Sequence, residues 1–471
     1  MRRTTKSEFI SLILSKLSVS PTQGQKAAIQ LFADYICCKE KEGLMLLKGY
    51  AGTGKTTLVS AFVAALDALE INTVLLAPTG RAAKVLGNYS DKQAYTIHKA
   101  IYKIKVDKDG TERLALKKNE YRNTIFFVDE ASMIYDFRQT DVSSLFSETN
   151  LLEDLFVYVE EGINCRLVFI GDTAQLPPVG LSYSPALDAD FLKDNFSRLL
   201  FSCELTEVMR QVKKSGILYN ATKIRYLIGN QYEKAYSFVF DKFADVEKIS
   251  SNQLLEKLET AYQQSDYYNV VLITRSNKQA NLLNKAIRAQ ILYREEELER
   301  GDLVICVKNN YYWLDKDSDI QFIANGDMME IVRMRGEEQR YGFRFVDVRL
   351  RLVDYAEEEI DAKLILDSLY TEGASMTSES RKELFQRVIV DYMHIPSKKQ
   401  RFEAVRNDPY LNALQVKFAY AQTCHKTQGG QWDTSFIYQG YLSDTLFGDD
   451  YHRWLYTAVT RAKKKMYWVG E

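Results

Sequence analysis

A glycine-rich loop that follows a short apolar run constrains this 471-residue chain more than any other feature. Residues 49–56 read Gly-Tyr-Ala-Gly-Thr-Gly-Lys-Thr and fit the pattern G-x-x-x-x-G-K-[ST] without a gap, directly after the apolar run 44–47. Glycines let consecutive backbone N–H groups turn onto phosphate oxygens, and the helix expected to open at Lys55 adds the positive end of its dipole. A glycine-rich turn without a ligand would require neither the Lys-Thr pair nor the strand before it. The loop therefore predicts a nucleotide site.

The residue types in this loop also predict how the nucleotide is held. The Lys55 ammonium would reach the β- and γ-phosphates, and the Thr56 hydroxyl would hold Mg²⁺. The contacts expected from the loop and the first helical turn are Gly52, Thr53, Gly54, Lys55, Thr56 and Thr57.

The pattern of apolar runs predicts an α/β protein with two parallel sheets. Short apolar runs alternate with helical patterns in the first part of the chain, and a second such region has no phosphate loop of its own. The runs of the first region are 45–47, 73–77, 124–128 and 166–170, and those of the second are 270–274, 415–421, 436–438 and 466–469.

Two insertions interrupt this alternation. Residues 101–106 and 113–116 flank Asp109-Gly110, and an Asp-Gly pair between alternating residues predicts a β-hairpin. From about 301 to 408, strand-like segments are followed by charged helical patterns at 381–394 and 398–406. This mixture predicts a small β-barrel with a helical elaboration.

Charge and cysteine content exclude several classes of protein. The 62 Lys and Arg residues balance 63 Asp and Glu residues, so nucleic-acid binding would need a local channel rather than a global basic field. The six cysteines lack metal or redox spacing and indicate reduced, buried residues of a cytoplasmic protein. No apolar run approaches the roughly 18–20 residues that span a bilayer, so we expect no membrane association.

Two strand ends carry candidate catalytic side chains. The apolar run 124–128 ends in Asp129 and Glu130, where a parallel sheet presents its ligand-binding edge. Asp129 would hold Mg²⁺ and Glu130 would deprotonate the attacking water, although an acidic pair after a strand can also cap a helix. Gln175, after the run 167–170, could sense a γ-phosphate, but Gly-Asp and Pro-Pro in the same segment also make ordinary turns.

Further segments occur in the order of the motifs of superfamily 1 helicases, and the chain resembles a superfamily 1B helicase of the RecD-like and Dda-like group. The resemblance extends from about residue 21 to residue 468. The segments are Ala77-Pro78-Thr79-Gly80-Arg81, Thr96-Ile97-His98, Val128-Asp129-Glu130-Ala131, 171–178, Leu205-Thr206 to Arg210-Gln211, 423–429 and Tyr456-Thr457-Ala458-Val459-Thr460-Arg461-Ala462.

The resemblance implies roles for individual residues at the nucleotide site. Thr22 and Gln25 match an adenine-reading glutamine motif, which suggests ATP as the nucleotide; the alternative is a surface glutamine before a helix. Arg210 and Arg461 match the two family arginines that point at the γ-phosphate from the second lobe, where they would couple hydrolysis to closure. Either arginine could instead form a structural ion pair.

Other matched positions face single-stranded DNA in the family. Small hydroxyls, backbone amides and a few cations suit phosphate tracking without sequence readout. The first-lobe positions are Pro78, Thr79, Arg81 and His98, and the second-lobe positions are Thr423, His425 and Lys426. Thr427 stands where the family usually has serine or alanine, and we expect little change from it because a hydroxyl remains.

The resemblance also implies the domain organisation. It predicts two RecA-like P-loop NTPase lobes, with the hairpin inserted in the first and a Src-homology-3-like barrel inserted in the second. The expected ranges are 1–98 and 123–205 for the first lobe, 99–122 for the hairpin, 206–300 and 409–471 for the second lobe, and 301–408 for the barrel with its helices.

From these features and the resemblance we expect an ATP- and Mg²⁺-dependent DNA helicase that acts as a monomer on single-stranded DNA and on duplex DNA with a 5′ single-stranded tail. The resemblance implies movement from 5′ to 3′. Two alternatives stay open: an RNA-dependent helicase of the same superfamily, because no residue reads a 2′-hydroxyl, and a nucleic-acid-binding ATPase that only switches. Repair, recombination, replication restart and phage-related work are all compatible pathways, and protein partners are not indicated.

Overall fold

The computed structural model describes most of the chain. The described residues are 5–38, 43–106, 112–136, 139–140, 148–208, 214–230, 232, 234–314, 322–353, 355, 358–440 and 447–470. Arg210 and the expected hairpin turn at Asp109-Gly110 lie outside these residues.

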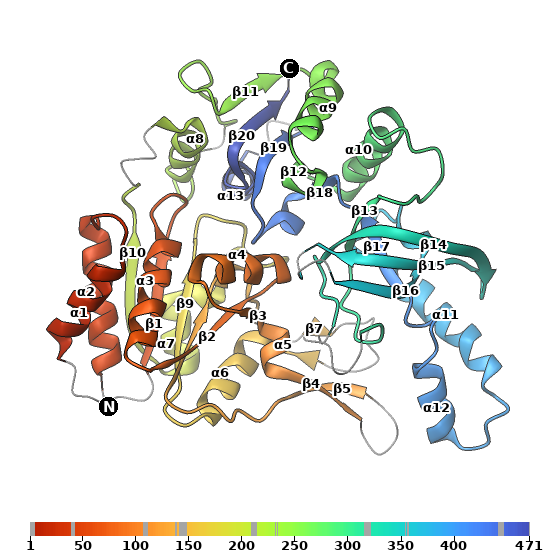
Figure 1. Cartoon of the computed structure of the whole chain (residues 1–471), viewed down its shortest axis with the longest axis horizontal. Helices are drawn as coiled ribbons and strands as arrows, with labels where there is room; N and C mark the ends of the chain where they lie inside the picture. Colours follow the sequence, from red (N-terminus) through yellow and green to blue (C-terminus); the bar gives the residue numbers. More distant parts are fainter. Residues whose placement is uncertain are drawn as a thin grey trace.

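The first lobe is built on a six-stranded parallel sheet (Figure 1). In sheet order its strands are β10 Leu199–Leu205, β1 Gly43–Gly49, β9 Arg166–Gly171, β6 Thr124–Val128, β2 Asn72–Ala77 and β3 Ala94–Thr96. Its helices are α1 Lys6–Lys16, α2 Gln23–Cys37, α3 Lys55–Ala68, α4 Gly80–Ser90, α5 Ile97–Ile101, α6 Leu151–Glu161 and α7 Ala189–Phe196.

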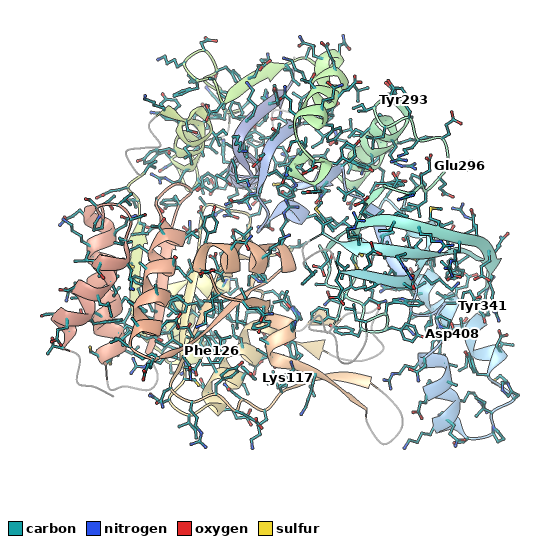
Figure 2. The ribbon with its side chains drawn as sticks, in the orientation of Figure 1. Lys117, Phe126, Tyr293, Glu296, Tyr341 and Asp408 are labelled. Carbon is teal, nitrogen blue, oxygen red and sulfur yellow. The ribbon has the colours of Figure 1, made fainter. Side chains whose placement is uncertain are left out.

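Successive side chains of each strand point to opposite faces of the sheet, so the sheet has a separate hydrophobic core on each face. Met45 and Leu47 of β1 pack with α1, α2 and α3 on one face, whereas Leu44 and Leu46 pack with α5, α6 and α7 on the other. Phe126, labelled in Figure 2, belongs to the second of these cores and is fully buried. Burial on both faces explains why the strands read as continuous apolar runs in the sequence.

The expected hairpin projects from the first lobe (Figure 1). Strand β4 Tyr102–Val106 pairs antiparallel with β5 Glu112–Leu116. Lys117 ties the base of this hairpin to α5, because its backbone N–H donates to the Ile101 carbonyl at 2.7 Å and its ammonium donates to the Lys99 carbonyl at 2.5 Å (Figure 2).

The second lobe has a smaller parallel sheet and lies above the first in Figure 1. In sheet order its strands are β11 Val246–Ile249, β20 Ala462–Val469, β19 Trp432–Tyr438, β12 Val270–Thr274 and β18 Ala421–Thr423. Its helices are α8 Gly216–Arg225, α9 Leu254–Gln264, α10 Asn277–Gln290 and α13 Asp449–Val459.

A closed five-stranded barrel is inserted in the second lobe, as predicted. Its strands are β13 Leu303–Cys306, β14 Met328–Arg340, β15 Phe343–Leu352, β16 Glu359–Ile365 and β17 Leu414–Phe418, and its helical elaboration is α11 Ser378–Asp391 and α12 Lys398–Arg406. Tyr341 and Asp408, labelled in Figure 2, fasten these helices: Tyr341 donates to Asp391 at 2.6 Å, and Tyr392 donates to Asp408 at 2.9 Å.

Two expectations differ from the structure. The run 415–421, expected as one strand of the second lobe, is divided: β17 closes the barrel, and only β18 enters the lobe's sheet. The six cysteines are free, but only Cys306 and Cys424 are buried. The residue boundaries given above for the domains stay predictions.

Across the residues that the structure describes, no helix is both long enough and apolar enough to cross a membrane.

Candidate nucleotide site and nucleic-acid interface

The phosphate loop lies at the carboxyl end of β1 and leads into α3. Gly52 and Gly54 have φ values of 74° and 81°, a left-handed conformation that glycine adopts without strain. Gly54 is the N-cap of α3 and provides no side-chain cap, whereas Thr22 and Thr79 cap α2 and α4 with their hydroxyls. The first N–H groups of α3 are therefore left for an anionic ligand, and this geometry fits a nucleotide phosphate.

Lys55 lies over its own loop. Its ammonium donates to the Gly49 carbonyl at 2.6 Å and to the Tyr50 carbonyl at 3.1 Å. Its charge also acts on two carboxyls: burial raises the pKa of both Asp129 and Asp172, and the Lys55 charge opposes that rise. The structure thus brings the predicted phosphate-binding lysine close to both acidic strand ends.

Asp129 and Glu130 occupy the end of β6, as predicted. Burial and then the neighbouring Glu130 carboxylate raise the pKa of Asp129 to about 7, while the Glu130 N–H, 2.9 Å from Asp129 Oδ1, opposes that rise. Glu130 has φ 51°, a left-handed conformation that costs a non-glycine residue roughly 1–2 kcal/mol. Such strain is typical of functional positions.

These residues fit a divalent cation and a nucleotide. A buried carboxyl beside a second carboxyl calls for a compensating cation, and hard oxygen ligands of this kind suit Mg²⁺. Asp129 and Thr56, in the first turn of α3, are the residues that would hold the ion, and their roles stay predictions. Among the described residues, no group of three or more His, Cys, Asp or Glu side chains could hold a metal by itself.

Gln25, the predicted adenine reader, is fully engaged with the protein. Its Oε1 accepts from the Thr22 N–H at 3.0 Å and its Nε2 donates to the Thr53 carbonyl at 3.0 Å, so that the side chain ties α2 to the phosphate loop. Gln25 lies beside the nucleotide loop as expected, and base recognition by it stays a prediction.

Gln175 lies in the loop after β9 and is 5% exposed. Its Oε1 is buried without a hydrogen-bond partner, and an amide oxygen can only accept. Because phosphate oxygens also accept, this atom is better suited to a water molecule or another donor. The γ-phosphate role of Gln175 stays a prediction.

Arg461 is the one of the two arginines expected to point at the γ-phosphate that lies among the described residues. Its guanidinium is 3% exposed and donates within the second lobe to the Thr457 carbonyl at 3.0 Å and the Gly430 carbonyl at 3.1 Å. Burial raises the pKa of Asp172, and the Arg461 charge is one of the groups that oppose this rise. Arg461 therefore lies near the boundary between the lobes.

The sequence did not indicate that α8 covers the phosphate loop. The Arg225 guanidinium lies 4.0 Å from the centre of the Tyr50 ring, with its Nη1 buried and unpaired. A Cβ added at Gly52 would lie 3.1 Å from Leu218. No motif marks α8, and only proximity in space reveals the contact.

The loop after β9 bonds directly to the second lobe. The Leu176 N–H donates to Thr457 Oγ1 at 2.9 Å, and Gln428 Nε2 donates to the Leu176 carbonyl at 2.7 Å. Arg453 also donates to the Thr173 carbonyl. These contacts join the loop after β9, in the first lobe, to α13 and to the segment 423–429 of the second lobe.

The structure brings together the two segments expected to face DNA. Pro78 and Thr79 lie between β2 and α4, and Thr79 caps α4 through the Ala82 N–H at 3.2 Å. Across the lobe boundary, a Cβ added at Gly429 would lie 2.8 Å from Ala82 Cβ and 3.1 Å from Thr79 Oγ1.

Arg81 crosses this boundary. Its guanidinium lies 3.9 Å from the centre of the Trp432 ring and donates to the Gln431 carbonyl at 3.0 Å. In this arrangement Arg81 holds the two lobes together, and a DNA contact by it stays a prediction.

Of the four remaining candidates, the three that can carry a charge are less positive than their residue types suggest. Burial lowers the pKa of His98 to about 4, and burial also lowers the pKa of His425. The pKa of Lys426 falls to about 7 because of burial and, secondarily, the Lys417 charge. Thr423 ends β18, and the following 3-10 turn, Cys424–Thr427, carries His425 and Lys426. Phosphate tracking here would depend mainly on hydroxyls and backbone N–H groups.

Two family models match the chain. An AAA domain matches residues 21–226, and a UvrD-like helicase C-terminal domain matches residues 418–469. The first match contains the phosphate loop and Asp129-Glu130, and the second contains Arg461.

Individual proteins are also similar to this chain. The ATP-dependent DNA helicase dda of Enterobacteria phage T4 is 26% identical, and the alignment covers 95% of this chain and 99% of that protein. The ATP-dependent RecD2 DNA helicase of Deinococcus radiodurans is 30% identical over 38% of this chain and 21% of its own length. A crystal structure of Pif1 helicase from Bacteroides in complex with ADP-AlF3 and single-stranded DNA aligns with a TM-score of 0.48, at 16% identity, over 96% of this chain and 92% of that chain.

The ordered motifs, the two lobes that meet at the phosphate loop, and the sequence matches along the chain agree: the chain is similar to superfamily 1B helicases over nearly its whole length.

Proposed function

We propose that this protein is an ATP- and Mg²⁺-dependent DNA helicase that moves 5′ to 3′ on single-stranded DNA and separates duplex DNA. The observation that carries the proposal is the junction of the lobes. There, the segments expected to face DNA touch at Thr79 and Gly429, and Gln428 bonds to the loop that follows Asp172. Movement of the second lobe can therefore reach both the DNA path and the nucleotide site.

The residue types predicted for the nucleotide site support the chemistry of ATP hydrolysis. Lys55 and the N–H groups of the phosphate loop bind the β- and γ-phosphates, and Glu130 takes a proton from the attacking water. Thr56 and Asp129 would hold Mg²⁺, which would supply positive charge against the phosphates. Arg210 and Arg461 neutralise the charge that develops on the transferred phosphoryl group.

The proposals of a DNA substrate and of a direction rest on the similarity to superfamily 1B helicases and on the names of the relatives. DNA helicases dda and RecD2 support DNA over RNA, and the superfamily 1B resemblance supports 5′-to-3′ movement. The hairpin of β4 and β5 is proposed as the wedge that separates the strands, and the protein is proposed to act as a monomer.

ATPase rates with no nucleic acid, with single-stranded DNA and with single-stranded RNA test this proposal against its alternatives. The proposal expects strong stimulation by DNA and weak stimulation by RNA. Stronger stimulation by RNA would favour the RNA-dependent helicase, and a rate that neither nucleic acid changes would favour the nucleotide-switched binding protein.

A further inference from the structure

One buried hydroxyl lies between the phosphate loop and the acidic loop of the first lobe, yet it comes from the second lobe. Tyr456, on α13, accepts from the Ala51 N–H at 2.8 Å and donates to Asp172 Oδ2 at 2.6 Å. Its side chain is 1% exposed. The two residues that it contacts are therefore bridged by a residue 405 positions away from Ala51.

The direction of these hydrogen bonds is fixed by protonation. Burial and the Asp172 charge raise the pKa of Tyr456 well above its usual value, so that the phenol keeps its proton. The proton is therefore available to Asp172, and the phenol oxygen is available to the Ala51 N–H. Asp172 Oδ1 accepts from the Ala174 N–H at 2.9 Å, so both of its oxygens are engaged.

This bridge is continuous with the segment expected to face DNA. Gln428, directly before Gly429, donates to Leu176, and Leu176 donates to Thr457, the neighbour of Tyr456 on α13. A displacement of residues 423–429 can thus reach the phosphate loop through two hydrogen bonds at Leu176, one step along α13 from Thr457 to Tyr456, and the Tyr456–Ala51 hydrogen bond. Such a set of contacts can transmit a displacement because each hydrogen bond has a defined partner on the other lobe.

We propose that Tyr456 is a positioning residue that holds the phosphate loop and Asp172 in register with the second lobe, and so carries the stimulation by nucleic acid to the nucleotide site. The inference rests on the proposed function, because it concerns how the same ATPase responds to DNA. Tyr456 acts through Ala51 and Asp172 and does not itself react.

A purely structural role is the competing explanation, and α13 offers a matched control. Tyr451 is 2% exposed on the same helix, and its hydroxyl donates at 3.0 Å to Gln439 inside the second lobe. Tyr456→Phe and Tyr451→Phe each remove one buried hydroxyl and keep the ring. Only the first removes a contact between lobes.

The test measures kcat and KM for ATP with and without an oligo-dT strand for the wild type and both variants. We expect Tyr456→Phe to lower the ratio of DNA-stimulated to unstimulated kcat about tenfold, the factor that corresponds to roughly 1.4 kcal/mol for a lost hydrogen bond to a charged group. KM for ATP and oligo-dT affinity should change much less, and Tyr451→Phe should keep the wild-type ratio. An unchanged ratio in Tyr456→Phe, or an equal fall in both variants, would overturn the inference.

A double-mutant cycle and hydrogen exchange make the result specific. Tyr456→Phe and Asp172→Asn should be strongly non-additive in the stimulation ratio, and additivity would contradict the bridge. Amides of residues 49–57 should exchange faster in Tyr456→Phe than in Tyr451→Phe, and equal exchange would overturn the inference. Hydrogen exchange is measured without DNA. If the wild type shows no stimulation by DNA, the proposed function is refuted, and hydrogen exchange still tests whether Tyr456 holds the phosphate loop.

Discussion

Replacing Gly429 with alanine perturbs the junction of the two lobes at a single point. Gly429 has φ 73°, and an added Cβ would lie 2.8 Å from Ala82 Cβ and 3.1 Å from Thr79 Oγ1. The left-handed backbone costs an alanine roughly 1–2 kcal/mol in any arrangement of the lobes. The clash adds about 1–3 kcal/mol, and it acts only while the lobes are in contact.

The two costs are separated by a control at Gly229. Gly229, also in the second lobe, has φ 79° and nothing within 4 Å of an added Cβ, so Gly229→Ala carries the backbone cost alone. We expect both variants to lose similar stability, measured as the melting temperature. Only Gly429→Ala should lose DNA-stimulated ATPase, by roughly 5–150-fold, the range that corresponds to the clash. Equal ATPase rates in the two variants would show that contact at Gly429 is not needed for turnover.

Four further outcomes test the site. Lys55→Ala should abolish ATP hydrolysis and keep single-strand binding, measured by fluorescence anisotropy, because it removes charge from the phosphates only; an equal loss of DNA binding with and without nucleotide would count against this role. Glu130→Gln should bind ATP and slow hydrolysis roughly 10²–10⁴-fold; turnover within a few-fold of wild type would refute the assignment as base. Shortening the hairpin 101–116 should spare DNA-stimulated ATPase and strongly reduce unwinding of a 5′-tailed duplex, because a motor without a wedge waits for fraying of steps worth about 1.4 kcal/mol each; parallel loss of ATPase and thermal stability would indicate a packing role. Burial lowers the pKa of His98 in the folded protein to about 4, below the usual 6.5, so the unfolded chain takes up the proton first and the free energy of unfolding falls as the pH is lowered from 6.5 to 4. His98→Asn should reduce that loss of stability, measured by urea titration at several pH values. An unchanged pH dependence would contradict the shift.

Most of the fold could be predicted from local patterns in the sequence. The phosphate loop, the two paired hairpin strands and the apolar strands of the sheets are each predicted from neighbouring residues, and the structure contains them. The run 415–421 was assigned to one strand because apolar periodicity reports burial and does not report which sheet buries a strand. Both the barrel and the second lobe bury their strands, so the division between β17 and β18 leaves no local signal.

The parts of the site that the sequence did not predict are contacts between distant segments. The contact of Arg225 with Tyr50, and that of Tyr456 with Ala51 and Asp172, join the two lobes through residues that lie far apart in the sequence. A single chain offers no pattern that pairs such residues. The reduced charge of His98 likewise follows from burial that only the fold creates.

Strand displacement by the purified chain with ATP and Mg²⁺ tests the central claim most directly. Three duplexes of the same sequence carry a 5′ single-stranded tail, a 3′ single-stranded tail or no tail, and Lys55→Ala serves as the inactive control. The account predicts ATP-dependent separation of the 5′-tailed duplex only. Separation of the 3′-tailed duplex alone, or of none of the three despite DNA-stimulated ATPase, would contradict it.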